Sequence, residues 1–188
     1  ASVISDSYHG LFPDGFQGPV FNSLAVCDLD IMRPELKDLC HRGDITIPDV
    51  FEHAIKEFPN VAFASVASKF EEVQLNFFNE AAMSMGKPAN TSLIGFYPRV
   101  RNTLDRQNRY PNFVSCLVPL RHHSFHTCSA FFDRPVGAGY TSLADWERQF
   151  VADTPHSRLR SVCLDGKNET AVTLCDKSVG LKEFVRPN

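Results

Sequence analysis

A continuous apolar run at residues 61–67, VAFASVA, limits the folds open to this chain more than any other feature. A half-exposed strand alternates apolar and polar residues, whereas a run without alternation is typical of a strand buried on both faces of a parallel sheet. Two other segments also read as strands: residues 1–5, ASVIS, and residues 113–119, FVSCLVP. The sequence therefore predicts a parallel sheet whose strands are joined by helices, an α/β fold.

Helical periodicity is found between and after these strands. From Pro48, which suits a first helical turn, apolar residues mark one face as far as Phe58. Residues 72–85 form a second predicted helix, a weaker pattern covers 93–104, and 143–151 form a closing helix. In the second helix we expect one apolar stripe made of Val73, Phe77, Ala81 and Met85. Residues 10–20 carry several glycines and prolines and predict an irregular loop.

Composition narrows the class of protein. The chain has 188 residues, of which 43% are hydrophobic and 22% charged, and this ordinary globular balance excludes wholesale disorder. The net charge of −3 gives none of the basic excess expected of a nucleic-acid-binding module. No apolar run approaches the roughly 18 residues that span a bilayer, so we expect no membrane span.

Cysteines and glycosylation motifs point to an oxidising compartment. The six cysteines form three local couples in the sequence and suggest three short-loop disulfides, although the sequence does not determine the pairing. They are Cys27, Cys40, Cys116, Cys128, Cys163 and Cys175. Two N-x-S/T sequons begin at Asn90 and Asn168. Together these features predict a secreted or secretory-pathway glycoprotein, with Ala1 a processed or truncated start. We expect two regions, a main domain over residues 1–156 and a disulfide-tied surface appendage over 157–188.

Chemistry-bearing side chains follow each predicted strand. In parallel sheets, functional groups gather at the carboxyl ends of the strands, which here precede residues 6–9, 68–72 and 121–126. An acid after one strand and a histidine after the next match two members of a hydrolytic triad, in which a carboxylate orients an imidazole base. A metal site using the H-H-x-x-H run would need a nearby acid to complete it, and none is present, so no metal or other cofactor is implied.

Two blocks resemble the pectin acetylesterase and Notum family of carboxylesterases. Segment 68–78, SKFEEVQLNFF, is similar to the family's catalytic-acid segment, in which an Asp is followed by a Gln three residues later and then an aromatic pair; Glu71 stands at the Asp position. Segment 112–124 is similar to the last core strand and the histidine loop, and alignment on Pro119 and the aromatic pair at 131–132 places the family histidine at His123.

Weaker similarities occur in the same order along the chain, at Asp6-Ser7 after the first strand and at Trp146 in the closing helix, so the resemblance covers about residues 1–150. Two departures stand out. Glu71 replaces the family's Asp, a substitution known among triads. Leu120-Arg121 replaces the glycine before the histidine, so His126 stays open as the alternative base.

The family's nucleophile is not found in these residues. No G-x-S-x-G elbow occurs, and Ser7 lacks the small flanking residues that such a turn requires. We therefore expect this chain to be the C-terminal part of an α/β-hydrolase fold, partnered by the N-terminal part of the same precursor. That part would supply the serine and the oxyanion donors, and a parallel sheet cut at this point would expose the edge of its first strand.

The resemblance implies a secreted serine carboxylesterase that removes O-acyl groups from a polysaccharide or a lipidated protein. Glu71 and His123 would be its catalytic acid and base, with Tyr8, His9, Phe12 and Phe16 as candidates for lining an acyl pocket or for simple core packing. Two rival hypotheses remain. One is a non-enzymatic family member that serves as a structural or binding module, and the other is an unrelated secreted α/β protein.

Overall fold

A computed structural model describes residues 1–118, 121, 123–127, 142–152 and 162–163 of the chain. The regular elements follow in this order: β1 Ser2–Asp6, α1 Gln17–Ser23, η1 Val26–Asp28, α2 Pro34–His41, α3 Ile47–Glu57, β2 Ala62–Ser68, α4 Glu72–Ser84, α5 Leu93–Gln107, β3 Phe113–Val118, η2 Phe125–Thr127, α7 Leu143–Ala152 and β4 Val162–Cys163. The predicted alternation of strands and helices is confirmed, with flanking helices on a parallel sheet.

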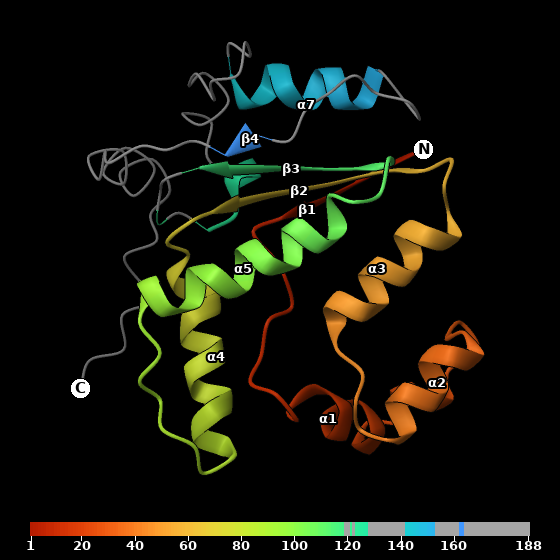
Figure 1. The fold of residues 1–188 in the computed structure, drawn as a ribbon, viewed down its shortest axis with the longest axis vertical. Coiled ribbons are helices and arrows are strands. Elements are labelled where there is room, and N and C mark those ends of the chain that lie inside the picture. The colour runs from red at the N-terminus through yellow and green to blue at the C-terminus, as the bar shows by residue number, and fades with distance from the viewer. Residues whose placement is uncertain (119–120, 122, 128–141, 153–161, 164–188) are drawn as a thin grey trace.

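The sheet has the order β1-β2-β3-β4, and every pair of neighbours is parallel. All seven residues of β2 are buried, as its apolar sequence predicts for a strand covered on both faces. Figure 1 shows α7 on one side of the sheet and α3, α4 and α5 on the other. The result is a three-layer α/β arrangement among the described residues.

Each face of the sheet has its own hydrophobic core. On the α7 side, Leu143, Trp146 and Phe150 pack against residues of β2 and β3. These strand residues are Ala62, Ala64, Val66, Cys116 and Val118. On the opposite side, Phe63, Ala67, Phe113 and Leu117 of the strands pack against side chains of α3, α4 and α5. The alternation of strand residues between the two cores follows from the period of two in a β-strand.

Helix α3 begins with a complete capping box. The Thr46 hydroxyl accepts a hydrogen bond from Asp49 N, the Asp49 carboxylate accepts one from Thr46 N, and Pro48 lies in the first turn. At the other end of α3, Asn112 lies before β3 and reaches the helix terminus. Its Nδ2 lies 2.9 Å from Ile55 O, 3.2 Å from Phe58 O and 3.1 Å from Val61 O. These contacts join α3, β2 and β3 at the amino end of the sheet.

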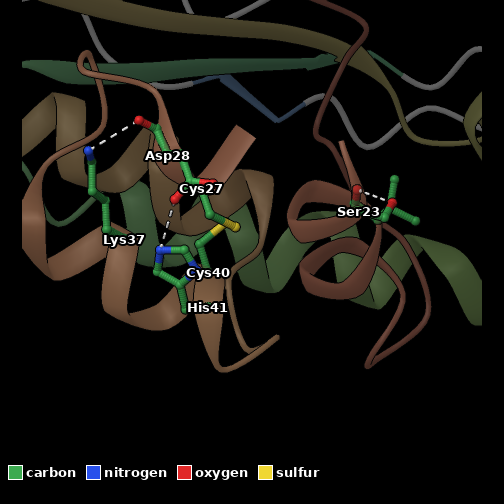
Figure 2. Close-up of a disulfide and its surroundings, with 7 residues drawn as sticks. Ser23, Cys27, Asp28, Lys37, Cys40 and His41 are labelled. Atoms are coloured by element: carbon green, nitrogen blue, oxygen red, sulfur yellow. Dashed lines mark hydrogen bonds and ion pairs between the residues drawn. A yellow bond between two sulfur atoms is a disulfide. The ribbon is translucent and has the colours of Figure 1, made fainter. Parts of the chain in front are cut away.

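The segment between β1 and α3 carries a small core of its own. A disulfide joins Cys27 to Cys40, with Cα atoms 5.4 Å apart, and Leu36 and Ile45 are buried beside it. Figure 2 shows this disulfide and two polar contacts near it, from Lys37 Nζ to the Asp28 carbonyl and from His41 to the Asp28 carboxylate. One of the expected disulfides is thereby confirmed.

The other cysteines are described only in part. Cys116 is buried in β3, whereas Cys128, Cys175 and the side chain of Cys163 lie outside the described residues. Of the predicted appendage, only Val162–Cys163 is described, as the short strand β4 beside β3. Asn90 is exposed in the loop before α5, while Asn168 is also outside the described residues.

The expectation of an irregular loop over residues 10–20 is wrong for its last part, because α1 begins at Gln17. Two tertiary contacts hold this turn in place. The Gln17 side chain donates to Gly10 O and accepts from Ile47 N, and Gly18 lies so close to Gly43 that a Cβ atom there would meet its carbonyl oxygen at 2.1 Å. Long-range packing thus overrides the local signal of glycine and proline.

The expected stripe on α4 is wrong at Val73 and Phe77, although Ala81 is buried as predicted. Val73 and Phe77 are 36% and 53% exposed, whereas the buried face contains Gln74, Leu75, Phe78, Ala81 and Ala82. Apolar residues occur on both stripes of this helix, so periodicity alone does not select the face that packs. The buried face includes Gln74, whose amide makes the long-range hydrogen bonds described below.

Candidate active site

The candidate site lies at the carboxyl ends of three neighbouring strands. Asp6 ends β1 and is followed by Ser7, Glu71 follows β2, and His123 follows β3. Parallel strands end at the same edge of a sheet, so the topology brings together residues that are far apart in sequence. Glu71 and His123, the two predicted catalytic residues, are in contact.

Glu71 is the N-cap of α4. Its Oε1 accepts a hydrogen bond from Val73 N at 3.0 Å and its Oε2 accepts one from Gln74 N at 2.7 Å. Both amides are among those that a helix leaves without intrahelical partners, and a carboxylate at this end also interacts favourably with the helix dipole. The side chain is only 1% exposed, so these bonds fix a buried carboxylate in one orientation.

His123 Nδ1 lies 3.2 Å from Glu71 Oε1. The distance suits an ion pair or hydrogen bond, although Nδ1 is not aligned for a full hydrogen bond. The interaction with Glu71 raises the pKa of His123, and partial burial opposes that shift without cancelling it. One third of the His123 side chain is exposed, and no described residue hydrogen-bonds to its Nε2. This leaves Nε2 as the atom that could exchange a proton with a reacting group.

His126, the alternative base, has a different environment. Its Nδ1 lies 2.7 Å from Asp6 Oδ2, and its Nε2 lies 3.1 Å from Glu147 Oε1 on α7. Burial alone would lower the pKa of His126, but the two carboxylates outweigh it and raise that pKa. Because each ring nitrogen already faces a carboxylate, neither is placed to receive a proton from a nucleophile.

Asp6 fastens the loop that carries both histidines. Its carboxylate accepts hydrogen bonds from Phe125 N and His126 N, each at 2.9 Å, besides its contact with the His126 ring. Partial burial would raise the pKa of Asp6, but the hydrogen bonds from His126, Phe125 and Ser7 outweigh it and lower that pKa. Asp6 therefore stays ionised and holds the loop at the end of β1.

Ser7 also helps to hold the loop that carries the two histidines. Its hydroxyl donates to Asp6 Oδ1 at 3.0 Å and accepts from Ser124 N at 3.0 Å. The residue is fully buried and has a φ of 60°, in the left-handed region that a non-glycine residue rarely adopts. Since its hydroxyl is buried and already both donates and accepts a hydrogen bond, Ser7 is not available as a nucleophile.

Gln74 was not predicted as a functional residue, although it belongs to the segment that resembles the family's acid motif. Its Oε1 accepts from His9 N at 2.9 Å, and its Nε2 donates to Ser7 O at 2.7 Å. Gln74 thus ties the loop after β1 to the first turn of α4, where Glu71 is held. Only its position three residues after Glu71 could have identified it from the sequence. No sequence pattern identifies Glu147.

The proposed pocket residues do not gather in one place. His9 is buried, and it lines a small cavity on the α3 side of the sheet together with Tyr8, which is 46% exposed. Phe12 stacks on Phe16, with ring centroids 5.2 Å apart, and neither contributes to that cavity. The geometry of the described residues therefore gives Phe12 and Phe16 a packing role with each other.

Two further findings concern the described part of the chain. It contains no group of three or more His, Cys, Asp and Glu side chains that could hold a metal ion; His122 of the H-H-x-x-H run lies outside it. None of its helices combines the length and apolar character needed to cross a membrane.

The sequence matches no protein-family model, no curated protein and no solved structure.

The site thus consists of the buried Glu71 carboxylate, fixed at a helix N-terminus, and the partly exposed His123 imidazole, on a loop that Asp6 holds by hydrogen bonds. Such a couple can hold one imidazole tautomer and stabilise the imidazolium when the ring accepts a proton. The class of site that it defines is an acid–base couple at the carboxyl edge of a parallel α/β sheet.

Proposed function

We propose that this chain supplies the acid and the base of a secreted serine carboxylesterase of the pectin acetylesterase and Notum type. The observation that carries the proposal is the 3.2 Å approach of His123 Nδ1 to the buried, helix-capping Glu71 carboxylate. The substrate class is an O-acylated polysaccharide or a lipidated protein.

In the proposed mechanism, a serine outside these residues attacks the acyl carbon of the ester. His123 takes the serine proton at Nε2 and then gives it to the leaving alkoxide, so that the alcohol departs and an acyl-serine remains. His123 next takes a proton from water, the hydroxide attacks the acyl-serine, and the carboxylic acid leaves as the serine regains its proton. Glu71 orients the ring and stabilises its charged form at each proton transfer.

The free edge of β1 suggests where a strand carrying the nucleophilic serine could lie. Among the described residues β1 pairs with β2 alone, and Val3 on this strand is 41% exposed. A further strand added to this edge would end beside Asp6 and the histidine loop. We propose that this strand belongs to the N-terminal part of the same precursor and carries the nucleophile.

The test uses protein expressed from its complete coding region and a fluorophosphonate probe that labels activated serines. We expect labelling at a serine outside residues 1–188, together with hydrolysis of a short-chain acyl ester. His123→Ala should reduce hydrolysis by about a thousandfold or more, as removal of a triad member does. His126→Ala is the matched control and should retain more activity, because it changes the same loop without removing the proposed base.

Two results would reject this assignment. Folded protein with no labelled serine and no hydrolysis would favour the alternative, in which the fold serves as a structural or binding module and Glu71 only caps α4. Equal hydrolysis by wild type and His123→Ala would remove His123 from the mechanism.

A further inference from the structure

A cavity of about 130 Å³ lies between the sheet and helices α3 and α5. Polar residues of its lining include His9, Ser65 of β2 and Gln107 of α5, and Ile47 and Phe51 of α3 contribute apolar side chains. A water molecule needs only about 10–15 Å³ of such space, and a cavity of about 150 Å³ can hold a benzene ring. The cavity is therefore large enough for a molecule of several non-hydrogen atoms.

Two polar atoms of the lining residues are buried without a hydrogen-bond partner in the described part of the chain, His9 Nε2 and Ser65 Oγ. His9 is 6% exposed and Ser65 3% exposed. An unsatisfied polar group in the interior costs about 1–3 kcal/mol, so native proteins rarely leave one without a partner. Two such atoms on one cavity indicate that the cavity takes a hydrogen-bonding occupant.

The neighbours of Ser65 show that the unsatisfied hydroxyl is a local feature. Ser5, Ser65 and Ser115 are in register across β1, β2 and β3. The Ser5 hydroxyl donates to Tyr8 O at 2.7 Å, and the Ser115 hydroxyl accepts from Asn108 Nδ2 at 2.9 Å. Ser65 is the member of this row that lines the cavity without an internal partner among the described residues.

The charge state of the lining restricts the ligand. Burial lowers the pKa of His9 to about 4, although the nearby Glu71 carboxylate acts to raise it, so the ring is neutral near pH 7. Among the described residues no Lys, Arg, Asp or Glu side chain lines the cavity, so a charged ligand would meet no counter-ion from them. A hydroxyl group both donates and accepts, so it can pair with Ser65 and with either tautomer of His9.

We propose that this cavity is a binding site for a small uncharged alcohol, whose hydroxyl group hydrogen-bonds to His9 Nε2 and Ser65 Oγ and whose carbon atoms lie against Ile47 and Phe51. The argument for this site does not depend on the proposed ester chemistry. His9 and Gln74 connect its wall to the first turn of α4.

The test titrates protein expressed from its complete coding region with 1-propanol and follows the His9 ring resonances by NMR. We expect a saturable shift with 1-propanol and none with propionate, which has the same number of carbons and a negative charge. Ser65→Ala should weaken 1-propanol binding by about three- to tenfold, as expected for one lost hydrogen bond. Ser65→Val should fill the space and abolish binding.

Ser115→Ala is the matched control, since it removes a buried hydroxyl from the same face of the sheet outside the cavity lining; its binding should equal that of wild type. Circular dichroism checks that each variant is folded. The proposal is overturned if folded wild type gives no saturable response to 1-propanol, the result expected of a cavity that holds water only. Unchanged affinity in Ser65→Ala, or equal binding of propionate, overturns it too.

Discussion

Glu71 Oε1 lies 3.2 Å from His123 Nδ1, while the same carboxylate accepts hydrogen bonds from two amides of the first turn of α4. The helix therefore fixes the acid, and the acid fixes the imidazole. This double role means that removal of the carboxylate has two separable effects, one on the stability of the helix and one on the basicity of the histidine.

Glu71→Gln should lower the pKa of His123, because the carboxylate is the main reason that this pKa is raised. The amide keeps one oxygen for the cap, so we expect a smaller loss of stability than in Glu71→Ala, which should cost about 1–2 kcal/mol as a lost N-cap. NMR titration of the histidine ring and urea unfolding measure the two effects. Glu72→Gln is the control, since its exposed side chain pairs with Arg121; an equal pKa change there would contradict the assignment.

Asp6→Ala should loosen the loop that carries both histidines. The substitution removes the acceptor for Phe125 N and His126 N and one of the two carboxylates at the His126 ring. We expect amide exchange at these two residues to accelerate by about tenfold or more, since each amide loses its acceptor and local opening becomes easier. The pKa of His126 should fall at the same time. Unchanged exchange at both amides would show that Asp6 does not hold the loop.

Some elements of this fold are predictable from the sequence and others are not, for physical reasons. β2 was predictable because seven consecutive residues are buried, and α3 because Pro48 and its apolar face are local signals. The approach of Glu71 to His123 could be expected, since strand ends meet at one edge of a parallel sheet. The buried face of α4 could not be predicted, because Val73 and Leu75 are both apolar and only tertiary packing chooses between them. The hydrogen bond from His126 N to Asp6 joins residues 120 positions apart, and no local sequence pattern predicts such a contact.

Acid should destabilise the protein partly through His9. Its folded pKa of about 4 lies below the ordinary histidine value of about 6.5, so between these values the unfolded chain binds a proton that the native ring does not. The free energy of unfolding should therefore fall with decreasing pH, by up to about 3 kcal/mol from this residue. Urea unfolding at about pH 7 and pH 4.5 measures the loss, and His9→Gln should reduce it.

His123 and His126 act in the opposite direction. Their folded pKa values are raised, so their stabilising contribution is present at low pH and is lost as the pH rises through those values. A difference between wild type and His9→Gln isolates the contribution of His9 from theirs. An identical acid loss in both proteins would show that His9 is not buried in its neutral form.

The Cys27–Cys40 disulfide should stabilise the small core between β1 and α3. The two cysteines are 13 positions apart, and a cross-link over a loop of this size is worth about 3 kcal/mol when its effect is to restrict the unfolded chain. The double variant Cys27→Ser/Cys40→Ser should lower the free energy of unfolding by about that amount. Reduction of wild type should have the same effect on urea unfolding and should leave the double variant unchanged. A reductant effect of equal size in the double variant would assign the stabilisation to other cysteines.

Asn112 should be one of the most sensitive polar positions of the fold. Its side-chain amide reaches three backbone carbonyls that end α3 and lead into β2, and the residue is only 7% exposed. Asn112→Ala leaves those carbonyls without this donor and should cost about 1–3 kcal/mol. Asn112→Asp should cost more, because a carboxylate has no N–H to donate and would face three carbonyl oxygens. Urea unfolding at about pH 7 ranks the two variants, and Asn108→Ala, which loses the bond to Ser115, is a matched control on the same segment. A smaller loss in Asn112→Asp than in Asn112→Ala would mean that the donated hydrogen bonds are not what holds the two elements together.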